Sequence, residues 1–193
     1  MRINEIFCSL QGEGYHSGSA AVFVRFSGCN LRCPFCDTRH EDGVEMDEAA
    51  IVDAVRQYPA RLVVLTGGEP SLQLTASLVD ALHVAGKYVA VETNGTHALP
   101  PNVDWVTLSP KDAWLGQEAA VVLHRADELK VVYDGEHEPS DYRSLTTDHR
   151  FLQPMDSGDT VRNARIEAAT VEYIKWHPQW RLSLQIHKIL NIR

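Results

Sequence analysis

Three cysteines stand close together near the start of the chain. Cys29, Cys33 and Cys36 have the spacing C-x3-C-x2-C, and the fourth cysteine, Cys8, lies well upstream. Thiolates are ligands that iron–sulfur clusters and zinc both accept. A cubane cluster held by only three thiolates leaves one iron without a protein ligand, and the amino and carboxylate groups of a small molecule can chelate that iron. The triplet therefore predicts a 4Fe–4S cluster with an open iron.

Zinc is the alternative interpretation of the same triplet. A closed zinc site takes four Cys or His ligands, so Cys8 or His40 would have to complete it. Zinc modules usually supply a second C-x2-C or H-x3-H pair, and the sequence contains neither, which favours the cluster. Cys8 follows Ile6 and Phe7 in an apolar segment, where we expect a buried small hydrophobic residue.

Size and charge narrow the class of protein. With 193 residues and 44% hydrophobic content, the chain predicts a single domain spanning residues 1–193. A net charge of -8 with scattered basic residues opposes binding to nucleic acid. The sequence starts without a basic and apolar leader, and no apolar run approaches the roughly 20 residues of a membrane helix. We expect a cytoplasmic protein with reduced thiols and no membrane partner.

The elements that must position the cysteines alternate between strand and helix patterns. Amphipathic spacing predicts three helices, at 47–58 with Asp47 as N-cap, at 72–85 between Ser71 as N-cap and Gly86, and at 160–176. Apolar runs predict strands at residues 22–26, 62–66, 87–93, 105–108, 129–133, 151–153 and 182–186.

This alternation indicates a parallel sheet covered by helices, with all strand C-termini at one edge. The chain is too short for an eightfold barrel of about 250 residues, and residues 103–129 show no clear long helix. We therefore expect an α/β fold, a partial (open) β/α barrel of about six parallel strands with helices outside. Ligands collect at the C-terminal edge of such sheets, where the cysteine loop follows the first strong strand.

A second motif, Thr66-Gly67-Gly68-Glu69-Pro70, ends the next strand. Alone it would be an ordinary turn, because glycine supplies unusual dihedral angles and proline stops a strand. Beside the cysteine loop, the pair of motifs resembles the radical S-adenosylmethionine superfamily. The resemblance implies an enzyme that cleaves S-adenosylmethionine into a radical, with the glycine-rich strand end against the methionine part of the cofactor.

More specific segments surround these two motifs. They are Leu10-Gln11-Gly12-Glu13-Gly14-Tyr15, Arg25, Cys36-Asp37-Thr38, Glu92-Thr93-Asn94-Gly95-Thr96, Ser109-Pro110-Lys111, Gln153-Pro154-Met155 and 185–192. Together they resemble the 7-carboxy-7-deazaguanine synthase family over essentially the whole chain. The resemblance implies a lyase of queuosine and 7-deazapurine biosynthesis, which contracts the ring of 6-carboxy-5,6,7,8-tetrahydropterin to give 7-carboxy-7-deazaguanine and ammonia.

The resemblance also assigns roles residue by residue. Cys29, Cys33 and Cys36 would bind the cluster and Thr38 would bind Mg²⁺, with no catalytic residue beyond the cluster and the cofactor. The residues that would contact S-adenosylmethionine are Phe35, Cys36, Asp37, Gly68, Ser109, Pro110 and Lys111. Those that would contact the substrate are Leu10, Gln11, Gly12, Glu13, Arg25, Thr66, Gln153, Pro154, Met155 and Asp156.

Each of these side chains also has an ordinary alternative. Arg25 would bind the substrate carboxylate through its planar fork, or form a surface salt bridge. Thr38 would otherwise cap a loop, and Lys111 would be a solvated lysine. Glu13 would be a base or an acceptor for the guanidine-like edge of the pterin, or a solvated turn residue. His187, in a closing segment that would fold over the substrate, is interpreted as a structural residue on an apolar strand.

Two other functions and two partners complete the predictions. A glycyl-radical-enzyme activase would share the first two motifs but would lack residues 10–15 and 185–192, and a zinc-binding interaction module would be non-catalytic. The family resemblance implies a homodimer and a flavodoxin-type electron donor. The helix at 160–176, with Ile166, Ala169, Ile174 and Trp176, would pack internally or across the dimer interface.

Overall fold

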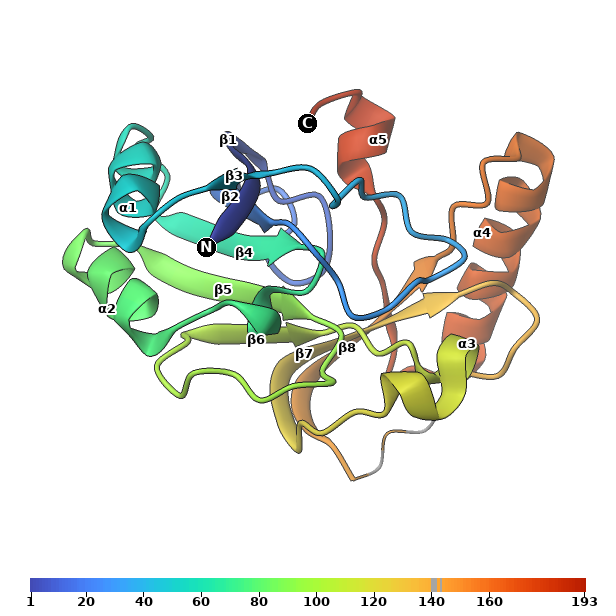
Figure 1. Cartoon of the computed structure of the whole chain (residues 1–193). Helices are drawn as coiled ribbons and strands as arrows, with labels where there is room; N and C mark the ends of the chain where they lie inside the picture. The colour runs from blue at the N-terminus through green and yellow to red at the C-terminus, as the bar shows by residue number, and fades with distance from the viewer. Residues whose placement is uncertain (140–141, 143) are drawn as a thin grey trace.

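The computed structural model of the protein describes residues 1–139, 142 and 144–193. Its centre is one nine-stranded sheet with the order β3-β1-β2-β4-β5-β6-β7-β8-β9 (Figure 1). The strands are β1 (Arg2–Leu10), β2 (Ala20–Phe26), β3 (Val44–Glu45), β4 (Leu62–Gly67), β5 (Tyr88–Thr93), β6 (Trp105–Leu108), β7 (Arg125–Tyr133), β8 (Thr146–Pro154) and β9 (Arg181–Leu182). The helices are α1 (Glu48–Arg56), η1 (Pro70–Leu72), α2 (Ala76–Val84), α3 (Asp112–Leu115), η2 (Gly116–Ala119), α4 (Thr160–Trp176) and α5 (Ile186–Leu190).

Strand direction confirms the predicted open β/α architecture. β2 and β4 to β9 all run parallel, and β1 and β3 join one edge in antiparallel pairs. The parallel strands bring their C-termini to one edge, which carries the cysteine loop after β2 and the glycine-rich turn after β4. The two outermost strands of the order, β3 and β9, are not paired with each other, so the sheet is open.

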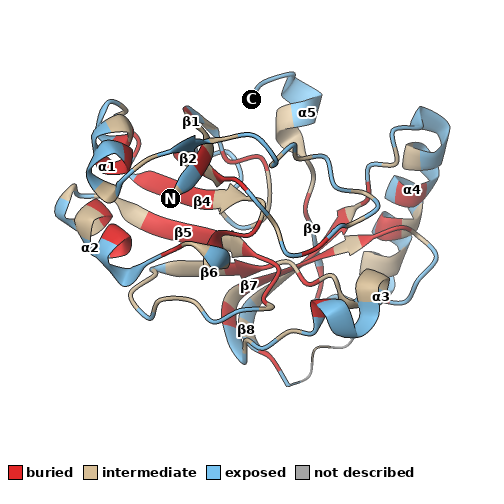
Figure 2. Cartoon of the chain, viewed as in Figure 1, coloured by how far each residue is buried: buried red, intermediate tan, exposed pale blue. Residues whose placement is uncertain are grey.

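The helices cover the outer face of the sheet in two groups. Ile51 and Val55 of α1 and Leu78 of α2 pack against Val63 and Leu65 of β4 in one apolar core. A second core lies between β6, β7 and β8 and helix α4. In Figure 2 the sheet and the inner sides of α1, α2 and α4 are buried, whereas the outer sides of these helices are exposed. This arrangement leaves the concave inner face of the sheet for polar side chains.

Capping residues explain most of the helix boundaries, and they also explain why one predicted N-cap is wrong. Asp47 caps α1 by accepting a hydrogen bond from Ala50 N at 2.8 Å, as predicted. Ser71 does not cap α2: it lies in η1, and Thr75 is the N-cap, accepting from Leu78 N at 3.2 Å. Pro70 favours the tight η1 turn, which delays the start of α2. Gly86, at φ 74°, follows the end of α2 as predicted.

One strand was missed and two further predictions are wrong. β1 was not predicted, because its inner face carries polar residues such as Glu5 that line a cavity. Cys8 is exposed rather than buried, since β1 has only the two-residue strand β3 beyond it. The strand predicted at 182–186 ends at Leu182, and α5 follows. No helix in the described part of the chain has the length and apolar character to span a membrane.

Candidate active site

The cysteine loop is fixed to the ends of two neighbouring strands. Gly28 N donates to His40 O at 2.7 Å, which closes the loop, and Glu69 N donates to Gly28 O at 2.9 Å, which ties the loop to the glycine-rich turn. Cys29 and Cys33 are half-buried and Cys36 is exposed. All three border one cavity of about 200 Å³, which we call the cysteine cavity.

Electrostatics in the cysteine cavity suit a bound anion. Burial raises the pKa of the Cys33 thiol, and the nearby Lys111 ammonium opposes that rise. Burial also lowers the pKa of Lys111 to about 8. The Lys111 ammonium donates to Ser109 O at 2.5 Å and to Ser109 Oγ at 2.7 Å. Burial disfavours the thiolate form, but a bound metal would favour it, because a metal binds the thiolate and not the thiol.

The arrangement of the thiols fits a cluster better than a single ion. Among the described residues, no group of three or more His, Cys, Asp and Glu side chains is placed to hold one metal ion. The three cysteines instead surround a volume. A cubane distributes its thiolates over different irons, whereas zinc needs four ligands about one point. The donor set therefore suits an iron–sulfur cluster.

The glycine-rich turn lies directly against the cysteine loop. A Cβ atom at Gly68 would overlap the carbonyl of Gly28 and would lie 3.0 Å from Cys29 N. Gly67 has φ +121°, a conformation that L side chains rarely adopt. Only glycine at these two positions lets the end of β4 pack under the cysteines.

Glu69 links three segments around the cavity. Its buried carboxylate accepts hydrogen bonds from Thr93 Oγ1 at 2.7 Å and from Asn94 N at 2.7 Å. Asn94 Nδ2 in turn donates to Asn30 Oδ1 in the cysteine loop at 3.1 Å. The carboxylate thus joins the ends of β4 and β5 and, through Asn94, supports the loop.

Glu69→Gln is expected to lower the free energy of unfolding by about 1–3 kcal/mol, because the amide group would place a donor against a buried donor. Chemical denaturation of the protein without cofactors measures this change. Glu172→Gln, which alters an exposed ion pair on α4, is the matched control and is expected to cost less than about 1 kcal/mol. Equal stability of the two variants would contradict the structural role of Glu69.

A second cavity of about 480 Å³ lies beside the first, and we call it the polar cavity. Its lining includes Leu10, Gln11, Gly12, Glu13, Arg25, Thr38, Thr66, Glu92, Gln185 and His187. The residues that line both cavities are Glu13, Asp37, Thr38, Thr66, Glu92 and Gln185. A molecule in the polar cavity would therefore share a wall with one bound beside the cysteines.

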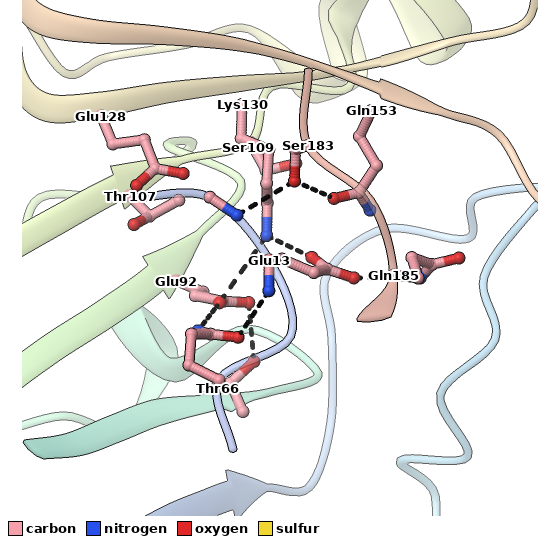
Figure 3. Close-up of polar contacts among 12 residues, drawn as sticks. Glu13, Thr66, Glu92, Thr107, Ser109, Glu128, Lys130, Gln153, Ser183 and Gln185 are labelled. Carbon is pink, nitrogen blue, oxygen red and sulfur yellow. Dashed lines mark hydrogen bonds and ion pairs between the residues drawn. The ribbon is translucent and has the colours of Figure 1, made fainter. Parts of the chain in front are cut away.

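The two sides of the polar cavity differ in charge. Arg25, at the β2 side, pairs with Glu5 at 2.9 Å, and its guanidinium lies 3.5 Å from Thr38 Oγ1. The opposite side, formed by β5 and the loop after β1, carries the carboxylates of Glu13 and Glu92 (Figure 3). A ligand with a carboxylate at one end and hydrogen-bond donors at the other would match this distribution.

Comparison with known proteins decides the family. The sequence pattern of the radical SAM superfamily matches residues 23–113. A protein from Bacteroides thetaiotaomicron named 7-carboxy-7-deazaguanine synthase is 54% identical over 192 residues, covering 100% of this chain and 98% of the relative. The chain belongs to the 7-carboxy-7-deazaguanine synthase family. A relative of the same name from Bradyrhizobium diazoefficiens is 42% identical and covers 99% of this chain and 98% of its own length.

A comparison with solved structures supports this family assignment. The crystal structure of QueE from Escherichia coli superposes with a TM-score of 0.73 at 30% identity, covering 95% of this chain and 92% of that one. The structure of Streptococcus suis SuiB bound to precursor peptide SuiA, at 14% identity and a TM-score of 0.52, shares only the fold. Membership in a radical SAM family supports a 4Fe–4S cluster and S-adenosylmethionine as cofactors, and it decides against the zinc module and the activase.

Most residues that the 7-carboxy-7-deazaguanine synthase resemblance assigned do line the two cavities. Phe35, Cys36, Asp37, Gly68, Ser109 and Lys111, with Met155 and Asp156, border the cysteine cavity. Pro110, Gln153 and Pro154 lie outside both linings. Gln153 is buried, and its Oε1 accepts from Ser183 Oγ at 2.9 Å. Ser183 Oγ also accepts from Gly14 N at 3.0 Å, so Gln153 braces the loop that carries Glu13.

The closing segment, residues 185–192, contributes to both cavities: Gln185 borders both, and His187 and Lys188 border the polar cavity. His187 belongs to helix α5 and not to a strand, and it packs against Gly12. Lys188 donates to Asp156 at 2.7 Å and lies 2.8 Å from Asp37, which joins α5 to β8 and to the cysteine loop. The Lys188 hydrogen bond is the main cause that lowers the pKa of Asp156.

Sequence reasoning left several lining residues without a role. Glu92 and Gln185 stood inside recognised motifs; Glu92 lies at the end of β5, which was its available signal, whereas Gln185 precedes α5, which was not predicted. Lys130 was not identified at all. Its signal was a charged residue between apolar neighbours in β7, because such a residue in a buried strand needs a partner on the inner face.

Proposed function

We propose that the chain catalyses the radical ring contraction of 6-carboxy-5,6,7,8-tetrahydropterin to 7-carboxy-7-deazaguanine, with release of ammonia. The observation that carries this proposal is the wall shared by the cysteine cavity and the polar cavity. When bound, the cluster and S-adenosylmethionine would supply a carbon-centred radical that takes a hydrogen atom from the substrate. The protein would contribute position and electrostatics on both sides of that wall.

The polar cavity matches the two ends of this substrate. The guanidinium of Arg25 would bind its carboxylate, replacing part of the ion pair with Glu5. Gln11 and the carboxylates of Glu13 and Glu92 would accept or exchange hydrogen bonds with the amide and amino groups of the pterin. Leu10, Gly12 and Thr66 would pack around the ring. Met155 and Asp156 border the cysteine cavity and would meet the substrate only across the shared wall, and Gln153 and Pro154, which lie outside both linings, would act from behind it.

Thr38 is the proposed ligand of Mg²⁺. Its hydroxyl borders both cavities and lies 3.5 Å from the Arg25 guanidinium. Mg²⁺ keeps several waters and is often held by one or two protein oxygens together with substrate oxygens. A cation at Thr38 would therefore meet the same carboxylate that Arg25 binds.

Arg25→Gln is expected to raise the KM for the pterin by about 10- to 100-fold, because charged hydrogen bonds to the carboxylate would be lost. S-adenosylmethionine binding is expected to stay within about threefold of the original. Steady-state kinetics and calorimetry measure the two quantities. Arg162→Gln, an exposed change on α4, is the control, and an unchanged KM in Arg25→Gln would contradict the carboxylate role.

Two partners belong to the proposal. The cluster must be reduced before each reaction, and the exposed Cys36 places it near the surface, where a flavodoxin-type donor would dock. A second copy of the chain would cover apolar residues on α4, since Val161, Val171 and Trp176 are exposed there. Of the helix residues predicted to pack internally, Ile166 is buried and Ala169 and Ile174 contact the second core.

Product analysis tests the proposed reaction. The anaerobically reconstituted and reduced protein is incubated with the pterin, S-adenosylmethionine and Mg²⁺, and the mixture is separated by chromatography. We expect 7-carboxy-7-deazaguanine to form. If S-adenosylmethionine is consumed while the pterin persists, the protein is a radical enzyme but the proposed substrate is wrong.

A further inference from the structure

Lys130 borders the cysteine cavity, contacts two residues that line both cavities, and has no role in the proposed reaction. It projects from the inner face of β7, and its side chain is only 5% exposed. Its ammonium lies 2.5 Å from Glu13 Oε2 and 3.6 Å from Glu92 Oε1 (Figure 3). A buried ammonium with two carboxylates is costly to assemble, so its geometry needs a reason beyond packing.

The Lys130 ammonium pairs with two carboxylates that come from different parts of the chain. Glu13 comes from the loop after β1, and Glu92 comes from β5. Each carboxylate has a second neutral donor: Gln185 Nε2 lies 3.0 Å from Glu13 Oε1, and Gln11 Nε2 lies 2.9 Å from Glu92 Oε1. Lys130 is the one charged donor that joins the two groups among the described contacts.

A neighbouring carboxylate, Glu128, lies near this cation but forms no ion pair with it in the described part of the chain. Glu128 lies two residues earlier on the same face of β7 and is buried. Its Oε2 accepts from Tyr15 N at 3.0 Å, and among the described residues its Oε1 has no hydrogen-bond partner. Burial raises the pKa of Glu128, and the Lys130 ammonium opposes that rise. Glu128 therefore holds the backbone beside Glu13, while Lys130 holds the side chain of Glu13.

Lys130 is also unsuited to moving a proton. Burial alone would lower its pKa, but the carboxylates of Glu13, Glu92 and Glu128 raise it well above the ordinary lysine value. Burial would raise the pKa of Glu13, and Lys130 brings it below its usual value. At neutral pH the ammonium is permanent and the carboxylate of Glu13 stays ionised, so the contribution of Lys130 is fixed charge.

We propose that Lys130 is a positioning residue that fixes Glu13 and Glu92 as paired hydrogen-bond acceptors for the donor-bearing edge of the heterocyclic substrate. The inference rests on the proposed function, because the pterin supplies that edge. Two acceptors held by one buried cation keep their places when the cavity is empty, so less ordering is needed on binding. The proposed role acts through Glu13 and Glu92, which line both cavities, and needs no contact between Lys130 and the substrate.

The test is substrate binding in Lys130→Gln. The reconstituted enzyme, with its cluster left oxidised so that no turnover occurs, is titrated with the pterin in the presence of S-adenosylmethionine. We expect the Kd for the pterin to rise by about tenfold or more at neutral pH, because Glu13 and Glu92 lose the cation that holds them in place. The Kd for S-adenosylmethionine is expected to change by less than about threefold.

The pH dependence separates this role from packing. Without Lys130, burial dominates and the pKa of Glu13 rises. The ratio of variant to original Kd should then increase as the pH is lowered, because the Glu13 carboxylate of the variant gains a proton at a higher pH than that of the original protein. The charged or titratable groups facing Glu13 are Lys130 and Glu128 from β7, Glu92 from β5, Lys111 after β6 and His187 from α5. Taking the ratio of the two Kd values removes the effect of any group that titrates in the same way in the variant and in the original protein.

Matched variants keep the test decisive. Lys175→Gln alters an exposed ion pair of 2.8 Å on α4 and is expected to leave both Kd values unchanged. If Lys130→Gln does not fold, Lys130→Arg, which keeps the charge, is expected to fold and to bind the pterin within about tenfold of the original. Failure of both variants to fold, or a Kd ratio near one at every pH, would overturn the inference. If the original protein itself does not bind the pterin, the proposed function fails instead.

Discussion

Cys33→Ala is expected to prevent cluster assembly and to reduce product formation by more than about a thousandfold, because the radical chemistry depends on the cluster and not on a protein base. Cys33 borders the cysteine cavity between the two other thiols and is half-buried. With two thiolates left, the cubane loses one of its three protein ligands. Iron and sulfide analysis and the visible absorption of the reconstituted protein measure the first effect, and chromatography of the product measures the second.

The chain supplies a matched control for this substitution. Cys8 lies on β1, exposed and outside the linings of both cavities. Cys8→Ala is therefore expected to keep its iron, its sulfide and its activity. A Cys33→Ala protein that still bound a full cluster would contradict the assignment of the triplet, as would loss of the cluster in Cys8→Ala.

Gly68→Ala is expected to have the second-largest effect, by displacing the cysteine loop rather than removing a ligand. The added methyl group would overlap the Gly28 carbonyl, and both contacts involve backbone that cannot rotate away. Overpacking of this kind costs about 1–3 kcal/mol or more. We expect S-adenosylmethionine affinity to fall by about tenfold or more and cluster occupancy to fall with it.

Gly116→Ala separates this overlap from a general loss of glycine. Gly116 has φ +60°, and a methyl group there would meet no atom within 4 Å. Because Gly116 also has ψ −136°, that variant is expected to lose about 1–3 kcal/mol of stability through backbone strain and to bind cluster and cofactor normally. Calorimetric titration with S-adenosylmethionine compares the two proteins, and equal affinities would show that close packing at Gly68 is unimportant.

The sequence predicts the parallel core of the fold well because its strands are buried on both faces. Val63 and Leu65 face the helices, while Leu62 and Val64 lie in the inner cluster, so β4 is an uninterrupted apolar run. β1 lacks that signal: Phe7 is buried, but Glu5 faces the polar cavity. Strands that line the site carry the polar residues that function requires, and periodicity alone misses them.

The site was predictable where motifs are local and less so where it depends on distant pairs. The cysteine loop and the turn at Gly68 are contiguous segments whose chemistry can be inferred from spacing. The pairing of Lys130 with Glu13 joins residues 117 positions apart, and no local pattern indicates it. The same holds for α5, whose position depends on Lys188 reaching Asp37 and Asp156.

Transfer of deuterium is the most direct measurement of the central claim, that the shared wall of the two cavities brings a pterin to a radical generated beside Cys29, Cys33 and Cys36. The pterin is deuterated at C6 and incubated with the reduced, reconstituted protein, S-adenosylmethionine and Mg²⁺, and the adenosyl-containing molecules are examined by mass spectrometry. The account predicts deuterium in the 5′ position of the adenosyl group together with 7-carboxy-7-deazaguanine. Formation of that product with no deuterium in any adenosyl species, or cleavage of S-adenosylmethionine with the deuterated pterin intact, would contradict it.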